Sequence, residues 1–213
     1  SPAGGGGDRV PPMERARSLF EKIWDKRRIR SLPDGRDLLF VDRHIVQETT
    51  CAPAFENLAR ANRAVLRPDL TFAVQDHIVS TAPDRTEDSN PEGRDLMHAL
   101  RRNAARHGIR HYGIDHPRQG IVHVIGPELG IALPGTLLAC GDSHTSTVGG
   151  IGALGIGVGT SEAEHVLATQ TLALPRPRTM RIGFDGALGP GVTAKDLILF
   201  TIGRLGIAAG VGH

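Results

Sequence analysis

The apolar positions along the chain follow two alternating patterns, one typical of amphipathic helices and one typical of strands. Apolar residues spaced three or four apart predict helices over residues 13–29, 52–62, 91–108, 161–172 and 194–206. Short apolar runs predict strands over residues 38–46 and 70–74, and further short runs lie at 109–113, 121–125 and 136–141. Strands that alternate with helices predict an α/β fold, with a mostly parallel sheet covered by helices on both faces.

Two helix starts carry a recognisable capping sequence. Ser161 is followed three residues later by Glu164, the spacing of a capping box, so we expect helix 161–172 to begin there. Thr193 and Asp196 form a weaker version of the same pattern before the last predicted helix.

Glycine and proline divide the chain into three parts. Residues 1–12, SPAGGGGDRVPP, predict a disordered lead-in, and the PRPR sequence at 175–178 predicts a hinge. We therefore expect a first domain over residues 13–176 and the start of a second α/β domain, with one strand and one helix, over residues 177–213. Because the chain stops in a glycine-rich turn after that helix, we expect the second domain to continue beyond the end of this chain.

Composition excludes several classes of protein. The formal net charge is only +2, and the basic clusters at residues 26–30 and 101–110 contain no interleaved aromatic residues, so nucleic-acid binding is not expected. No run approaches the ~18 apolar residues of a membrane span. The two cysteines, Cys51 and Cys140, form no CxxC motif, which excludes a disulfide scaffold and an all-cysteine metal site within this chain. Such cysteine usage fits a reducing, cytoplasmic location.

Polar residues follow three of the predicted strands. Gln47 follows the first strand, Asp76 and His77 follow the second, and the run Asp142-Ser143-His144-Thr145 follows the run at 136–141. The carboxyl ends of parallel strands are where α/β sheets bind ligands, so these residues are candidates for a functional site. Each group also has a structural interpretation, since an Asp-His pair can simply be a hydrogen-bonded pair. His123 lies within the apolar run 121–125, and a lone histidine in an apolar strand is more often a core histidine than a functional one.

The glycine run after residue 145 contains the spacing of a dinucleotide fingerprint, at Gly150, Gly152 and Gly155. The fingerprint requires its first glycine directly at a strand end and an acidic residue about 20 positions further on, and neither is found. We instead expect the glycines to let the backbone approach a ligand or a neighbouring domain closely. Ser143 lacks the GxSxG elbow of a hydrolase. A mononuclear metal site is left open, although no usual ligand spacing supports it.

Several long stretches resemble the large subunit of the 3-isopropylmalate dehydratases, within the aconitase superfamily. The resemblance runs from about residue 14 to residue 213 and rests on these sequences: DRHIVQETT, FAVQDHIVST, GIVHVIGPELG, LPGTLLACGDSHTSTVGGIGALGIGVGTSEAEHVLATQTL and PGVTAKDLILFTIGRLG. It implies a three-layer α/β/α domain of the aconitase type and a hydro-lyase that removes water from a hydroxy acid and adds it back, as in leucine biosynthesis. It also implies a [4Fe-4S] cluster in the complete enzyme.

The resemblance assigns roles to the candidate residues. His77, held by Asp76, would lie at the leaving hydroxyl, and His123 would pair with Asp142. Asp142, Ser143 and His144 would contact substrate or cluster, and Gln47 would contact substrate.

The resemblance also implies what this chain lacks. The cysteines that hold the cluster are expected beyond residue 213, so we expect no metal ligands and no bound cluster in this chain alone. Activity is expected to need the C-terminal part of the large subunit and the dehydratase small subunit, where much of the substrate specificity lies. The alternative is a non-catalytic fragment or assembly partner that keeps the fold.

Overall fold

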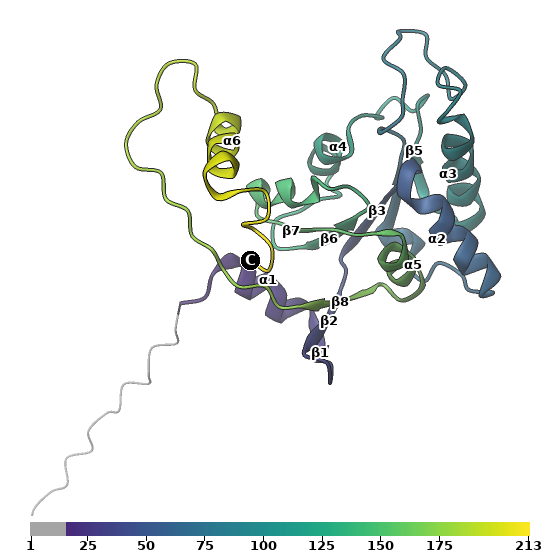
Figure 1. The fold of residues 1–213 in the computed structure, drawn as a ribbon. Helices are drawn as coiled ribbons and strands as arrows, with labels where there is room; N and C mark the ends of the chain where they lie inside the picture. Colours follow the sequence, from purple (N-terminus) through teal and green to yellow (C-terminus); the bar gives the residue numbers. More distant parts are fainter. Residues whose placement is uncertain (1–15) are drawn as a thin grey trace, which may run out of the picture.

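The computed structural model describes residues 16–213, and its helices and strands are labelled in Figure 1. The helices are α1 (Leu19–Arg27), α2 (Glu48–Arg60), α3 (Arg94–His107), α4 (Val122–Glu128), α5 (Thr160–Thr169) and α6 (Ala194–Leu205), with 3-10 helices η1 (Pro68–Leu70) and η2 (Thr145–Ile151). The strands are β1 (Arg28–Ser31), β2 (Arg36–Phe40), β3 (Arg43–Gln47), β4 (Thr71–Val74), β5 (Arg110–Tyr112), β6 (Leu137–Cys140), β7 (Leu154–Gly157) and β8 (Thr171–Pro175). The predicted lead-in, residues 1–12, lies outside the described residues.

The main sheet has five parallel strands in the order β5-β4-β3-β6-β7. Strand β3 is central, and its His44 lies opposite Thr71 of β4 and Ala139 of β6. The predicted α/β fold with a mostly parallel sheet is therefore confirmed. A second, antiparallel sheet of order β1-β2-β8 was not predicted.

The strand predicted over residues 38–46 is in fact two strands, β2 and β3, which belong to different sheets. The chain changes sheets at Val41 and Asp42. The Asp42 carboxylate accepts hydrogen bonds from the backbone N–H of Leu137, at 2.7 Å, and from the guanidinium of Arg27. Asp42 thus ties helix α1 and strand β6 to the point where the chain bends, which the apolar pattern did not indicate.

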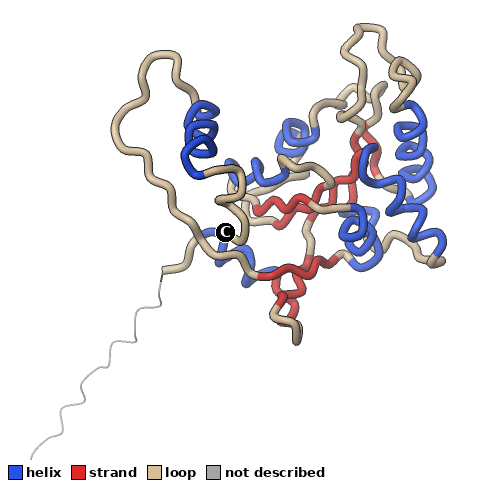
Figure 2. The backbone as a smooth tube through the Cα atoms, viewed as in Figure 1, coloured by secondary structure: helices blue, strands red, loops and turns tan. Residues whose placement is uncertain are grey.

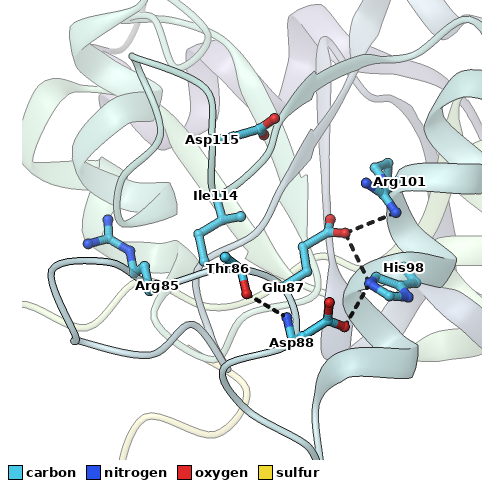
Figure 3. A pocket seen from close by; sticks show the side chains of 8 residues that line it. All are labelled: Arg85, Thr86, Glu87, Asp88, His98, Arg101, Ile114 and Asp115. Atoms are coloured by element: carbon cyan, nitrogen blue, oxygen red, sulfur yellow. Dashed lines mark hydrogen bonds and ion pairs between the residues drawn. The ribbon is translucent and has the colours of Figure 1, made fainter.

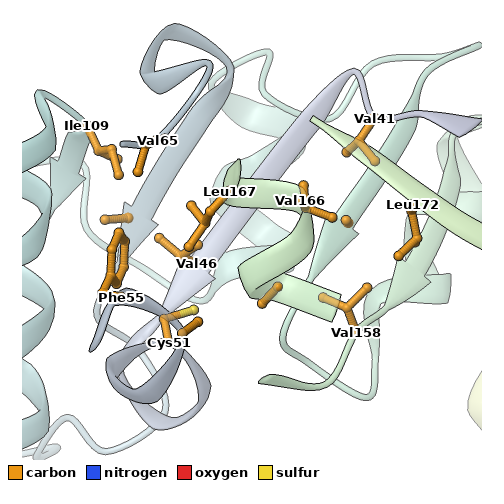
Figure 4. Packing of buried hydrophobic residues seen from close by; sticks show 14 of the residues in the cluster. Val41, Val46, Cys51, Phe55, Val65, Ile109, Val158, Val166, Leu167 and Leu172 are labelled. Carbon is orange, nitrogen blue, oxygen red and sulfur yellow. The ribbon is translucent and has the colours of Figure 1, made fainter. Parts of the chain in front are cut away.

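Alternate residues of the main sheet pack into two hydrophobic clusters, one on each face. Val46, Ala73 and Ala139 face helices α2, α3 and α5, and part of this cluster is shown in Figure 4. Ile45, Val74 and Leu138 belong to the other cluster, which includes residues of α4 and η2. Each buried strand is apolar on both sides because helices cover both faces, as expected for a parallel sheet.

Several helices begin at residues other than those that the sequence predicted. Residues 121–125 lie at and within the start of helix α4 and not in a strand. Helix α5 begins earlier than predicted, with Gly159 as its N-cap, and the Glu162 carboxylate accepts the Gly159 N–H at 2.7 Å. The predicted Ser161 and Glu164 box is therefore wrong, since Glu164 instead bonds Asn57 at 2.9 Å. Helix α2 begins at Glu48, before the predicted residue 52.

The segment after β8 extends away from the main sheet and returns toward β7 (Figures 1 and 2). Its helix α6 begins as predicted, because Asp196 accepts hydrogen bonds from the N–H and the hydroxyl of Thr193, each at 2.7 Å. The strand predicted in this segment is absent from the described residues 176–213, and no residue of α6 is buried. The domain boundary at 176 and 177 stays a prediction. Within residues 16–213, no helix combines the length and apolarity that crossing a membrane requires.

Candidate active site

Three loops that leave the carboxyl ends of β3, β4 and β6 meet at one edge of the main sheet. Gln47 ends β3, Asp76 and His77 follow β4, and Asp142 follows β6 after Gly141. These three strands are neighbours and run parallel, so their ends lie side by side. His123 joins them from the first turn of α4.

The carboxylate of Asp142 is the centre of this site, because three imidazoles approach it. The Oδ2 atom of Asp142 lies 3.3 Å from Nε2 of His77 and 3.5 Å from Nε2 of His123. Its Oδ1 atom lies 3.3 Å from Nδ1 of His144 and accepts the backbone N–H of His144 at 2.7 Å. Residues far apart in the sequence are thus brought together as predicted.

Asp76 orients His77 from the other side. Oδ1 of Asp76 lies 2.5 Å from Nδ1 of His77, and Oδ2 accepts the backbone N–H of Val122 at 2.7 Å. The Asp76 carboxylate therefore links the end of β4 to the first turn of α4, which carries His123. With Nδ1 hydrogen-bonded to Asp76, Nε2 of His77 lies 3.3 Å from Oδ2 of Asp142, so a protonated His77 is within ion-pair distance of both carboxylates.

The electrostatic environment separates the two inner histidines. The hydrogen bond to Asp76 raises the pKa of His77, against the opposing effect of partial burial. Burial lowers the pKa of His123, although Asp142 and Asp76 oppose this. Burial opposes ionisation of Asp142, but the His144 N–H and the nearby His123 and His77 lower its pKa overall. The site thus favours a protonated His77, a neutral His123 and an ionised Asp142.

The predicted substrate-binding residues differ in exposure. Ser143 and His144 are exposed, and the Ser143 hydroxyl lies 3.1 Å from Nδ1 of His144, beside a cavity of about 420 Å³ lined by Gly141, Asp142, Ser143, Gly157 and Val158. Gln47 is completely buried. Its amide donates to the carbonyl of Gly141 at 2.9 Å and accepts the N–H of Thr49 at 2.6 Å. Gln47 therefore joins the ends of β3 and β6, and its contact with substrate stays a prediction.

Two glycines of the run, Gly155 and Gly157, allow a close approach of backbone within the site. A Cβ atom at Gly155 would lie 2.1 Å from the carbonyl oxygen of Thr145, and one at Gly157 would lie 3.0 Å from that of Asp142. Glycine at these positions lets strand β7 pack against the backbone of the loop that carries Asp142 and His144. The close approach is thus made within the site itself, and neither a ligand nor a second domain is needed to explain it.

The sequence model of the aconitase family (aconitate hydratase) matches residues 21–213. The chain belongs to the aconitase family. Membership implies a hydro-lyase fold of the aconitase type, and enzymes of the aconitase family typically use an iron–sulfur cluster.

The cysteines of this aconitase family chain do not fit such a cluster. Cys51 and Cys140 are completely buried and pack in different hydrophobic clusters, on opposite faces of the sheet. Burial raises the pKa of Cys51 to about 11 and raises that of Cys140 as well, which keeps both thiols protonated. A cluster needs deprotonated thiolates from several cysteines. Two buried thiols do not supply them.

One group of three side chains has the composition of a metal site. Glu48, Asp76 and His77 each offer a ligand atom within 4.8 Å of the others. Backbone N–H groups already occupy the Glu48 oxygens, and Nδ1 of His77 is directed to Asp76. The group is therefore explained by hydrogen bonding, and we assign no metal to it.

A second cavity, of about 330 Å³, lies away from Asp142 and is shown in Figure 3. In its wall, the Glu87 carboxylate lies 3.2 Å from His98 and 3.1 Å from Arg101, and it accepts a hydrogen bond from Gln75 at 2.6 Å. The charges of Glu87, His98 and Arg101 are thus paired with one another, and Gln75 links them to the end of β4.

Sequence reasoning missed one residue of this site, Glu48. It follows the strand-ending Gln47 directly, as Asp76 follows Gln75, and this shared position at a strand end was the available signal.

Proposed function

We propose that this chain is the N-terminal part of a [4Fe-4S]-dependent hydro-lyase of the 3-isopropylmalate dehydratase type. Its partners would be the C-terminal part of the large subunit, which would hold the cluster, and the dehydratase small subunit. The observation that carries the proposal is the Asp142 carboxylate with three imidazoles around it at one edge of the sheet, in a chain of the aconitase family.

The arrangement suits the removal and addition of water. Loss of a hydroxyl group is helped by an acid that protonates it, and groups of fixed charge steady the carboxylates of the substrate. His77, whose pKa is raised by the hydrogen bond to Asp76, is the candidate acid. Asp142 lies within 3.5 Å of the imidazoles of His77 and His123, and the exposed Ser143 and His144 are placed to contact substrate.

The substrate is proposed to be 2- or 3-isopropylmalate or a related hydroxy acid. The resemblance to the isopropylmalate enzymes over most of the chain supports this choice. The match to the aconitase family does not by itself distinguish one hydroxy acid from another.

The test uses the complete enzyme, with this chain, the C-terminal part and the small subunit produced together and loaded with the cluster under anaerobic conditions. Isopropylmalate, homocitrate, citrate and their unsaturated counterparts are supplied in turn. Formation of the unsaturated acid is followed by ultraviolet absorption, and uptake of deuterium from solvent by NMR. We expect turnover of isopropylmalate that His77→Ala lowers by about 10²–10⁴-fold.

Turnover of another hydroxy acid alone would correct the substrate and leave the hydro-lyase proposal standing. A cluster-loaded complex that turns over none of these acids would contradict the proposal and favour the non-catalytic alternative.

A further inference from the structure

Glu48, the first residue of helix α2, is a completely buried carboxylate. Its hydrogen bonds come from the backbone of the next strand's loop, and no Lys, Arg or His side chain of the described residues forms an ion pair with it. Burying a carboxylate is costly unless several hydrogen bonds compensate for the lost water. Packing alone therefore does not explain why a carboxylate is buried at this position.

Three consecutive backbone N–H groups converge on Glu48. Its Oε1 atom accepts from the N–H groups of Asp76 at 3.1 Å, His77 at 2.6 Å and Ile78 at 2.9 Å. Its Oε2 atom lies 3.2 Å from the same Asp76 nitrogen. The carboxylate thus holds the chain directly after the end of β4.

Capping of its own helix does not explain this arrangement. The N-cap of α2 is Gln47, whose Oε1 atom accepts the N–H of Thr49 at 2.6 Å. The Glu48 side chain instead reaches from the end of β3 to the loop after β4. Strands β3 and β4 are paired in parallel, so this reach spans two adjacent strand ends.

The held loop carries the groups of the candidate active site. Asp76 and His77 supply two of the three N–H groups that donate to Glu48. Their side chains contact each other, and the His77 imidazole also lies 3.3 Å from Asp142. A side chain cannot keep its orientation when the backbone beneath it turns. The hydrogen bonds to Glu48 therefore set where the His77 imidazole lies.

We propose that Glu48 is a positioning residue, which fixes the loop of residues 76–78 so that the His77 imidazole stays between Asp76 and Asp142. Its importance for catalysis rests on the function proposed above, whereas its effect on the loop does not. Glu48 acts through backbone N–H groups and touches no reacting atom itself.

The first test is made on this chain by NMR, with Glu48→Gln and Glu48→Ala. Glutamine keeps one acceptor oxygen but loses the charge, and charge-assisted hydrogen bonds are roughly twice as strong as neutral ones. We expect amide exchange at Asp76, His77 and Ile78 to rise severalfold in Glu48→Gln and roughly 10-fold or more in Glu48→Ala, while amides of β6 keep their protection. The pKa of His77, raised in the native chain, should fall in both variants.

The matched control is Glu56→Gln, in the same helix. Glu56 has an exposed side chain and lies near Arg60, so its change should leave both readouts as in the native chain. If Glu48→Ala fails to fold, Glu48→Gln decides. Unchanged amide exchange and an unchanged His77 pKa in Glu48→Gln, or the same changes in Glu56→Gln, would overturn the proposal.

A second measurement separates this proposal from the proposed function. In the complete enzyme, Glu48→Gln should lower kcat about 10-fold or more with little change in KM, because a displaced acid weakens the chemical step more than binding. If the amides respond as expected but no hydroxy acid is turned over, the proposed function fails and the positioning of the loop stands. An active enzyme whose Glu48→Gln amides do not respond overturns the role of Glu48.

Discussion

The site's three buried carboxylates are each stabilised by different partners. Asp142 faces histidines, Asp76 bonds one histidine and one backbone N–H, and Glu48 bonds backbone N–H groups. Removing one partner of a buried charge costs more than the contact itself is worth, because the remaining charge is left without compensation. Substitutions here therefore act on neighbouring residues as well as on the one replaced.

Substitution of the central residues should separate chemistry from binding in the complete enzyme. We expect His77→Ala and Asp142→Asn to lower kcat by about 10²–10⁴, the usual worth of an acid or base, with smaller changes in KM. Ser143→Ala, which alters an exposed hydroxyl, should mainly raise KM. Steady-state kinetics with isopropylmalate measures all three, and near-native activity in every variant would show that these roles are wrongly assigned.

His44 makes the stability of the chain depend on pH. It is completely buried in β3, neither ring nitrogen has a hydrogen-bond partner among the described residues, and burial lowers its pKa to about 3. In the unfolded chain this histidine takes up a proton near the ordinary pKa of 6.5, whereas in the folded chain it stays neutral down to about pH 3. Above pH 6.5 it is neutral in both states, so His44 does not lower the free energy of unfolding there. The free energy of unfolding should fall by about 1.4 kcal/mol per pH unit as the pH drops from 6.5 toward 3.

Urea unfolding between pH 8 and pH 5 measures this effect. His44→Leu should be at least as stable as the native chain at pH 5 and should lose less stability between the two pH values. His165→Leu, at an exposed histidine, is the control and should follow the native curve. Parallel curves for His44→Leu and the native chain would exclude His44 as the cause.

The sequence predicted most of this site because the site lies at strand ends. Asp76, His77, Asp142 and His144 are polar residues that directly follow apolar runs, and that pattern is enough to place them at one edge of a parallel sheet. The burial of Gln47 could not be predicted, since it depends on the carbonyl of Gly141, 94 positions away. For the same reason the partners of Glu48 were not apparent from its neighbours in the chain.

Strand β7 and the loop after β6 depend on each other through glycine. Gly155→Ala should destabilise the chain by about 1–3 kcal/mol, because the new methyl group would overlap the carbonyl oxygen of Thr145 and the side chain of Val148. Gly149→Ala, in the same glycine run, is the control. Nothing lies within 4 Å of its Cβ position, so we expect a change within about 1 kcal/mol in either direction.

Chemical denaturation measures both glycine variants, and an NMR spectrum of His144 reports whether the loop has moved. Gly155→Ala with native stability and a native His144 signal would show that β7 is free to shift away from the loop. Equal destabilisation by both variants would point to the loss of glycine itself and not to the close approach.

At the level of elements, the pattern of apolar residues located the strands but did not show where one strand ends and the next begins. Residues 38–46 form one apolar run interrupted by charged residues, and only the hydrogen bonds of Asp42 show that the chain changes sheets there. The run at 121–125 contains β-branched residues that favour strands, yet it forms the start of α4. The hydrogen bond from Val122 to Asp76 and the packing of Val122 and Ile125 against the sheet outweigh that preference.

In the described molecule, residues 16–213, helix α6 is the α-helix without a buried residue. Its Ile198, Leu199, Phe200 and Leu205 side chains are 53–64% exposed. Apolar patches of this kind promote association, so we expect the purified chain to self-associate. Phe200→Ser should weaken that association, and Leu66→Ser, at a residue 55% exposed elsewhere, is the control.

Light scattering gives the mass of each variant, and hydrogen exchange gives the protection of its helices. We expect residues 197–205 to exchange faster than strand β6. A native chain that is monomeric, with α6 as well protected as β6, would mean that α6 is stable without a covering partner and that the exposed patch has no effect on association.

The strand order β5-β4-β3-β6-β7 has a consequence for where any ligand of this fold can enter. From β3 the chain first builds outward through β4 to β5, and it then crosses back to add β6 and β7 on the other side. The segment after β3 therefore turns to one face of the sheet, into α2, while the segment after β6 turns to the opposite face, into η2. Between these diverging segments the sheet has a topological switch point, the place where open α/β sheets bind their ligands. The topology thus puts the loop that carries Asp142 beside the place where a ligand enters, while the buried Gln47 and Glu48 hold the neighbouring strand ends from within.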